Sequence, residues 1–171
     1  GSATFLKQKS RYFIHKDIAG LHSESGELYK GYDVDSLVAF SCYGGKYLFD
    51  MSGGDESIRI AAENGGSGFF QFPLIINGEH NDRCIKGDNR PRCFRALAEK
   101  DNRLFIIDAK RPVVLSSFIN GLLNLNLRNA IYLDMGSYWN YSWYRNNDNK
   151  AIDLFSISQP FSGTWIVFKK Q

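Results

Sequence analysis

The stretch from Pro112 to Ser137 constrains the fold of this chain more than any other. Its first half carries apolar residues at helical spacing behind Ser116, and this pattern predicts a helix from about Ser117 to Leu125, with one of the two serines as its cap. The compact apolar run Ala130 to Leu133 predicts a buried strand, which ends abruptly at Asp134. A carboxylate therefore stands where a strand runs into a flexible turn, and ligand-binding side chains often occupy such places.

The composition indicates one soluble globular domain over residues 1–171. Hydrophobic residues make up 43% and charged residues 23% of the chain, which excludes a disordered or fibrous protein. The net charge of +3 is spread along the chain, so we expect no nucleic-acid partner. No apolar run approaches the ~18 residues of a membrane span. Because the initial Gly1-Ser2 resembles the remnant of a tag, we expect that an N-terminal leader or segment can be missing.

Short apolar runs between turn residues predict several further strands, and one more helix is expected after Asp55 or Ser57. Gly20–Gly26 is interpreted as a turn. The fold class that follows is α+β, with a mixed sheet flanked by a few helices. The expected strands are Ser10–Ile18, Tyr29–Tyr32, Val34–Phe40, Lys46–Asp50, Phe72–Gly78 with its Asn-Gly turn, Leu104–Asp108 and Thr164–Lys169.

Asn64–Phe70 is a glycine-rich segment with three glycines in five residues. Glycine permits positive φ and close approach of the backbone to a ligand, and such a loop can hold a phosphate through its N–H groups. The alternative is a tight turn between a helix and a strand. A Walker loop is excluded because the Gly-Lys-Ser/Thr ending is missing, and the dinucleotide fingerprint is incomplete.

Four arginines lie close together between the predicted strands of the middle of the chain: Arg83, Arg90, Arg92 and Arg95. Guanidinium groups bind phosphate bidentately and stay charged, so this cluster is the best anion site in the sequence. The alternative is a solvated loop with one or two structural ion pairs.

An aromatic run from Tyr138 to Tyr144 follows Asp134, and it includes Trp139 and Trp143. Flat aromatic faces suit the C–H patches of sugar rings, and this position favours a glycan-binding role. The same residues could instead form core or an edge strand, because Tyr and Trp favour strands.

The cysteines and histidines predict no metal site and no cofactor. His15, His22 and His80 are isolated, and no Cys or His pair has metal-ligand spacing. Cys84 and Cys93 could close a small extracytoplasmic disulfide loop or remain two free thiols, and Cys42 is expected to be buried.

The order of these segments resembles the phosphodiester glycosidase family, whose members include enzymes that remove N-acetylglucosamine from a phosphodiester cap. The likeness extends from about Asn64 to Ser137 and rests on Pro-Leu-Ile-Ile-Asn-Gly, an Arg-bearing segment running into Leu-Phe-Ile-Ile-Asp, a helix, and Ala-Ile-Tyr-Leu-Asp-Met-Gly-Ser. The closing Thr-Trp-Ile-Val-Phe strand is similar to bacterial members of the Bacteroides type. Asp134, Gly136 and Ser137 match the family's Leu-Asp-Gly-Gly-Gly-Ser motif, Gly66 and Gly68 match its glycine-rich turn, and its arginine matches either Arg92 or Arg95.

The chain departs from the family pattern in two places. Met135 replaces a glycine in a loop that is one residue shorter, and an early Asn-Gly-Gly-Phe-Phe motif has no counterpart before Asn64. Three explanations follow: the chain is a fragment, Asn64 and its glycines take over part of the motif's role, or activity is lost.

Two functional hypotheses result. The first is an extracytoplasmic hydrolase that cleaves a sugar-1-phosphodiester. In it Arg92 and Arg95 hold the phosphate, and Asp134 activates water or stabilises the anomeric carbon, with Asp108 as a candidate partner. Asn64, Gly66, Gly68, Gly136 and Ser137 surround the substrate, and Trp139 and Trp143 contact the glycan. The second hypothesis is a non-catalytic carbohydrate-binding or cell-surface domain on the same scaffold.

Overall fold

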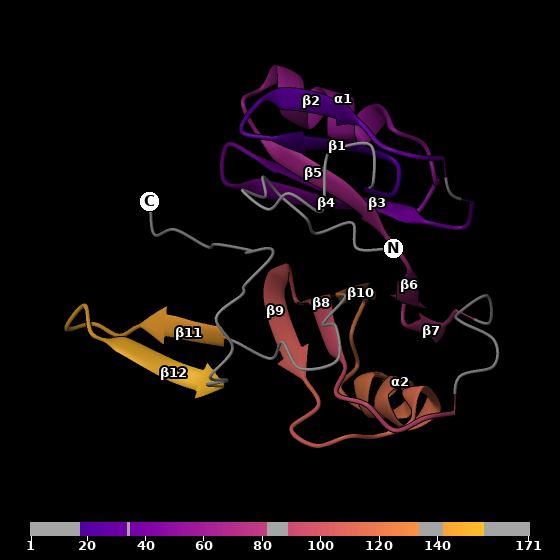
Figure 1. The fold of residues 1–171 in the computed structure, drawn as a ribbon, viewed down its shortest axis with the longest axis vertical. Coiled ribbons are helices and arrows are strands. Elements are labelled where there is room, and N and C mark those ends of the chain that lie inside the picture. Colours follow the sequence, from indigo (N-terminus) through magenta and orange to yellow (C-terminus); the bar gives the residue numbers. More distant parts are fainter. Residues whose placement is uncertain (1–17, 34, 82–88, 134–141, 156–171) are drawn as a thin grey trace.

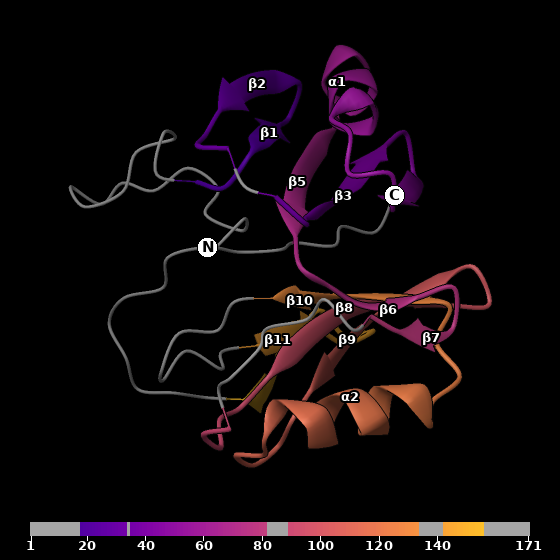
Figure 2. The ribbon, with the colours of Figure 1, turned by 90° about the vertical axis from the view of Figure 1, so that its right-hand side faces the viewer.

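Two five-stranded sheets lie face to face, and one helix covers the outer side of each (Figures 1 and 2). The structure is a computed structural model, and it describes residues 18–33, 35–81, 89–133 and 142–155. Within these ranges the layers follow the order helix, sheet, sheet, helix. The predicted α+β class is therefore confirmed.

The first sheet comes from the first part of the chain, and α1 packs on its outer face. The helix spans Glu56–Glu63, and its buried Ile58 contacts Ala39 and Phe70 of the sheet. In spatial order the strands are β2 (Glu27–Lys30), β1 (Leu21–Glu24), β5 (Ser67–Gln71), β3 (Val38–Tyr43) and β4 (Lys46–Asp50).

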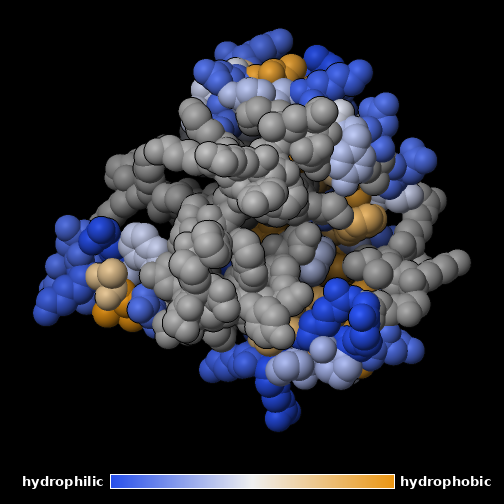
Figure 3. All heavy atoms as spheres, viewed as in Figure 1, coloured by the Kyte–Doolittle hydropathy of each residue, from blue (hydrophilic) through white to orange (hydrophobic). Residues whose placement is uncertain are grey.

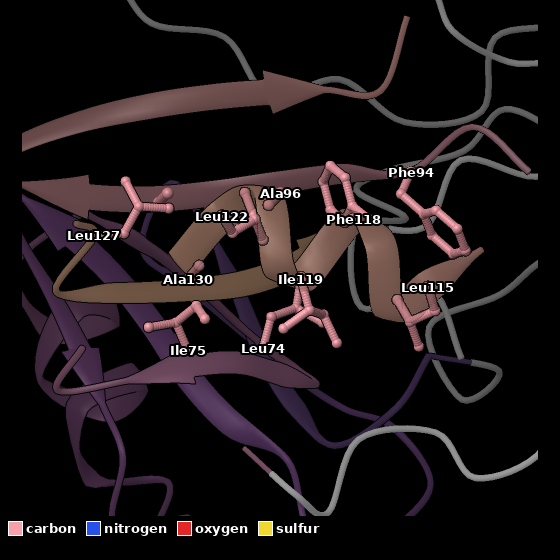
Figure 4. Packing of buried hydrophobic residues seen from close by; sticks show 11 residues of the cluster. Leu74, Ile75, Phe94, Ala96, Leu115, Phe118, Ile119, Leu122, Leu127 and Ala130 are labelled. Atoms are coloured by element: carbon pink, nitrogen blue, oxygen red, sulfur yellow. The ribbon is translucent and has the colours of Figure 1, made fainter. Parts of the chain in front are cut away.

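The second sheet carries α2 on its outer face, and Figure 4 shows the cluster that joins them. The helix spans Leu115–Leu123 and buries Leu115, Phe118, Ile119 and Leu122. In spatial order the strands are β7 (Glu79–His80), β6 (Pro73–Ile76), β10 (Asn129–Leu133), β8 (Arg95–Lys100) and β9 (Arg103–Asp108). A separate hairpin of β11 (Ser142–Arg145) and β12 (Ala151–Phe155) follows.

The inner faces of the two sheets share one apolar core. Phe40 and Phe69 from the first sheet pack with Leu97, Ile131 and Leu133 from the second. Leu97 and Ile131 are fully buried. These contacts hold the two halves of the described chain together, because burial of apolar surface is the dominant favourable term in folding.

The strand pairing differs from the single mixed sheet that we expected. Each pair of neighbouring strands in the two described sheets is antiparallel. Short turns join β1 to β2, β3 to β4, β6 to β7 and β8 to β9, and a short turn can connect only antiparallel neighbours. The exception to antiparallel order is the isolated parallel bridge between Ala19 and Tyr32.

Several predicted elements are confirmed with small shifts. The strands at Lys46–Asp50 and Ala130–Leu133 are present, and α1 begins directly after Asp55. The α2 helix begins at Leu115 rather than Ser117, with Val114 as a cap that makes no side-chain hydrogen bond. The predicted serine cap is therefore wrong, because both serines already lie inside the first helical turn.

The predicted turn at Gly20–Gly26 is also wrong, since its middle forms β1. His22 and Ser23 are polar but buried, and the strand pairs with β2 on one side and with β5 on the other. Long-range pairing with β5 overrides the weak local strand preference of this segment. The predicted strands at Ser10–Ile18 and Thr164–Lys169 lie almost wholly or wholly outside the described residues.

Neither helix in the described part of the chain is long and apolar enough to cross a membrane.

The substitution Leu97→Ala tests the shared core. Leu97 is fully buried between the sheets, so its truncation should lower the free energy of unfolding by about 2–5 kcal/mol. Urea unfolding measures this change. Leu28→Ala on β2 is the control, because Leu28 is 41% exposed, and its effect should stay within about 0.5 kcal/mol. Equal effects of the two substitutions would contradict a sheet–sheet core.

Candidate functional site

Arg95 and Asp108 form a bidentate ion pair at one end of the second sheet. Arg95 Nε donates to Asp108 Oδ1 at 2.6 Å, and Nη2 donates to Oδ2 at 3.0 Å. The side chains are 14% and 10% exposed, so the pair is largely withdrawn from water. Two parallel hydrogen bonds fix the orientation of a guanidinium as well as its position.

The sheet register explains why these residues meet. Arg95 begins β8 and faces Asp108 at the end of β9 on one side and Leu133 at the end of β10 on the other. Antiparallel pairing brings the start of one strand beside the ends of its neighbours. Leu133 is the last described residue before Asp134, so Arg95 lies across from the strand end that leads to the predicted catalytic carboxylate.

Arg92 stands three residues before Arg95, in the segment that leads into β8. Its backbone exchanges two hydrogen bonds of 2.9 Å with Val113, just before α2. The side chain of Arg92 is exposed, whereas that of Arg95 is half-buried. Arg90 is also exposed, and Arg83 lies outside the described residues. The structure thus brings Arg92, Arg95 and Asp108 to the same end of the second sheet.

The glycine-rich segment forms the end of α1 and its connection to β5. The backbone amides of Asn64, Gly65 and Gly66 all donate to carbonyls of the last turn of α1, at Ile60, Ala61 and Ala62. The Asn64 side chain also donates to the Ile60 carbonyl at 2.8 Å. These amides complete the helix end, so the alternative interpretation of a turn between a helix and a strand describes the segment.

Close packing accounts for Gly66 and Gly68 without a ligand. A Cβ on Gly66 would stand 2.2 Å from the Cys42 carbonyl oxygen and 2.5 Å from Tyr43 Cβ. A Cβ on Gly68 would stand 3.1 Å from Ile58 Cγ1, beneath α1. Both glycines let neighbouring backbone approach closely, which is one of the ordinary uses of glycine in strands.

The predicted site residues therefore fall into two separate groups. Phe72 lies at the same end of the second sheet as Arg95. Its carbonyl accepts a hydrogen bond from the Tyr132 amide at 2.8 Å, and the next residue, Leu133, pairs with Arg95. Gly66 lies six residues earlier along extended chain, roughly 20 Å away at the rise of a strand. The described structure does not bring Asn64, Gly66 and Gly68 to Arg95.

Trp143 is an exposed aromatic residue on the β11–β12 hairpin. It is 40% exposed and its neighbour Tyr144 is 49% exposed. The Arg145 guanidinium lies over the Trp143 ring, 5.4 Å from its centroid. Figure 3 shows apolar atoms on the outside of this hairpin among hydrophilic ones. The remaining predicted site residues, Asp134, Gly136, Ser137 and Trp139, lie outside the described residues.

A polar network that we did not predict links β8 and β10 of the second sheet to β4 of the first, through Glu99, Asn129 and Tyr47. Asn129 donates to Glu99 Oε2 at 2.8 Å, and the Tyr47 hydroxyl reaches Glu99 Oε1 at 3.5 Å. Burial and the Glu99 carboxylate both raise the pKa of Tyr47. Glu99 is buried at the end of the apolar run Ala96–Ala98, and a carboxylate that continues such a run was the available sequence signal. The network joins the sheets and has no evident catalytic role.

Cys42 and Cys93 are half-buried free thiols, and burial raises the pKa of Cys42. Cys84 lies outside the described residues. In the described ranges no three His, Cys, Asp or Glu side chains gather into a group that could hold a metal ion.

Comparison of the chain with models of protein families and with curated proteins gave no match to either.

The substitution Gly66→Ala tests the packing role of the glycine segment. The added methyl group would overlap the Cys42 carbonyl, so we expect a loss of about 2 kcal/mol or more in the free energy of unfolding. Gly65→Ala is the matched control: nothing lies within 4 Å of its Cβ, and only the positive φ of 71° costs energy, about 1 kcal/mol. Thermal unfolding would compare the two. A Gly66→Ala protein as stable as Gly65→Ala would show that close packing is not the reason for this glycine.

Proposed function

We propose that the chain is a hydrolase that acts outside the cytoplasm and cleaves the glycosidic bond between the sugar and the phosphate of a sugar-1-phosphodiester. The observation that carries this proposal is the strand register at Arg95, which lies opposite both Asp108 and the residue before Asp134. The family resemblance of this stretch supplies the substrate class.

The arginines supply the positive charge for the phosphate in this proposal. Asp108 holds the Arg95 guanidinium in one orientation, and the exposed Arg92 belongs to the segment that leads into the same strand. Phosphate that leaves from a sugar carries negative charge, and fixed guanidinium groups stabilise it without reorganising. Because the phosphate monoester that leaves is already a weak base, the reaction depends little on a strong general acid.

Asp134 is the proposed general base, or the carboxylate that stabilises the oxocarbenium-like carbon. The order of the chain supports this role, since Asp134 directly follows the strand that pairs with Arg95. Gly136 and Ser137 in the same turn would orient the sugar or the phosphate. We assign Asn64, Gly66 and Gly68 a structural role in the α1–β5 connection, which replaces their predicted contact with substrate.

Release of free sugar from a panel of sugar-1-phosphodiesters tests the proposal. Asp134→Asn should abolish turnover. Arg95→Lys keeps the charge but loses the bidentate fork, and it should lower kcat/KM by about 10- to 100-fold. Arg103→Lys is the matched control, because Arg103 is exposed at the opposite end of the β8–β9 hairpin. Full turnover by Asp134→Asn, or equal effects of the two arginine substitutions, would refute the mechanism.

A second candidate function is glycan binding without hydrolysis. The exposed Trp143 and Tyr144 on the projecting hairpin favour it, because an aromatic face in solvent can stack on a sugar ring. Met135, which stands where the resembled family has glycine, also favours it.

Binding to immobilised glycans separates this second candidate from the first. Trp143→Ala should weaken binding about tenfold, while Trp143→Phe keeps a ring and should retain most of it. Glycan binding that persists in Trp143→Ala would exclude the hairpin as the binding surface.

A further inference from the structure

The β9 strand has the sequence of a buried strand but stands at the edge of the second sheet. Its residues 104–107 form a continuous apolar run, Leu-Phe-Ile-Ile, between Arg103 and Asp108. Continuous apolar runs are typical of strands that are buried on both faces. In the described part of the chain, however, β9 pairs with β8 alone and ends the strand order of its sheet.

Both faces of β9 leave apolar side chains partly open to water. Phe105 is 37% exposed and Ile106 is 38% exposed, and successive residues of a strand point to opposite faces. Leu104 packs against the core between the sheets and Ile107 packs against the cluster beneath α2, but neither is fully buried. A further strand beside β9 would remove more of this apolar surface from water.

The backbone groups at the free edge of β9 follow from its register with β8. The Ala109 amide donates to the Phe94 carbonyl at 2.8 Å, so the adjacent Asp108 belongs to a pair that exchanges no hydrogen bonds with β8. Such pairs alternate with hydrogen-bonded pairs along an antiparallel ladder. Leu104 and Ile106 therefore also turn their N–H and C=O groups away from β8 and toward the free edge.

The free edge of β9 has none of the features that usually keep an edge strand from pairing. Proline, a charged residue within the strand or a β-bulge commonly serves this purpose. Between Arg103 and Asp108 the strand contains neither proline nor a charged residue, and its register with β8 is regular. An apolar edge without this protection is a place to which another strand can be added.

Two predicted strands lie wholly or almost wholly outside the described residues, and one of them is close in the chain to the second sheet. Ser10–Ile18 leads into Ala19, which forms a bridge with Tyr32 directly after β2 of the first sheet. Thr164–Lys169 instead follows the β11–β12 hairpin, which lies on the β9 side of the second sheet (Figure 1). Residues 156–163 separate this strand from the hairpin and can span up to roughly 25 Å.

We propose that the predicted strand Thr164–Lys169 pairs with the free edge of β9 and extends the second sheet. Its residues 165–168, Trp-Ile-Val-Phe, are apolar at consecutive positions like those of β9, so each strand covers apolar surface of the other. The pairing makes β9 an interior strand, and β9 carries Asp108, which orients Arg95. This inference concerns an interaction within the chain and does not depend on the proposed function.

Hydrogen exchange of the ¹⁵N-labelled full chain, followed by NMR, tests the pairing. We expect the Leu104 and Ile106 amides to exchange as slowly as the amides of β9 that bond to β8, because the added strand accepts their hydrogen bonds. Val167→Asp should speed the exchange of Leu104 and Ile106 by about tenfold or more, since it places a charge within the apolar run that pairs with β9.

Gln171→Asp is the matched control, because it adds the same charge beyond the predicted strand, and it should leave these exchange rates unchanged. Slow exchange of the Ile131 amide, in the buried part of β10, verifies that both variants are folded. A second measurement needs no variant: the unmodified chain should show NOEs between the methyl groups of β9 and those of Ile166 and Val167.

Three results would overturn the proposal. The first is fast exchange of Leu104 and Ile106 in the unmodified chain, or the absence of the methyl NOEs. The second is slow exchange that persists in a folded Val167→Asp variant. The third is slow exchange that appears only at high protein concentration, because a second copy of the chain would then occupy the edge.

Discussion

The apolar contact between the inner faces of the two sheets is the interaction on which the rest of the structure depends. Phe69 of β5 packs there with Leu97 of β8 and Ile131 of β10. Without this contact each sheet would keep one helix on its outer side and expose its inner face to water. The contact also positions the strand ends of the second sheet, and therefore Arg95 and Asp108. The candidate site is thus held in place by an apolar core that itself contributes no reactive group.

The Arg95–Asp108 pair is better explained by the orientation that it gives the guanidinium than by a contribution to the stability of the fold. Withdrawing two charges from water costs free energy that their attraction often only offsets, so a buried ion pair is weak evidence of a stabilising role. Its bidentate form fixes the direction of a guanidinium beside the end of β10. The proposed function assigns this oriented guanidinium the recognition of an oxyanion.

Particular elements show how far the sequence could predict the fold. The strands Lys46–Asp50 and Ala130–Leu133 were predictable because glycine turns or polar residues bound dense apolar runs. The β1 strand was not, because His22 and Ser23 carry little strand preference and are buried only through pairing with β2 and β5. In the candidate site Asp108 was a candidate from its strand end alone. Its bond to Arg95 depends on the β8–β9 register, which no local pattern specified.

The amino-acid sequence by itself determined the α+β class, the strand Lys46–Asp50 and the apolar strand before Asp134, because periodicity and turn chemistry act within a few residues. Only the tertiary structure decided that the strands divide into two antiparallel sheets and that the glycines at 66 and 68 serve close packing. It alone also revealed the free edge of β9. The physical reason is that a side chain's neighbours across a sheet or under a helix are distant in the chain, and burial against them is a property of the assembled layers.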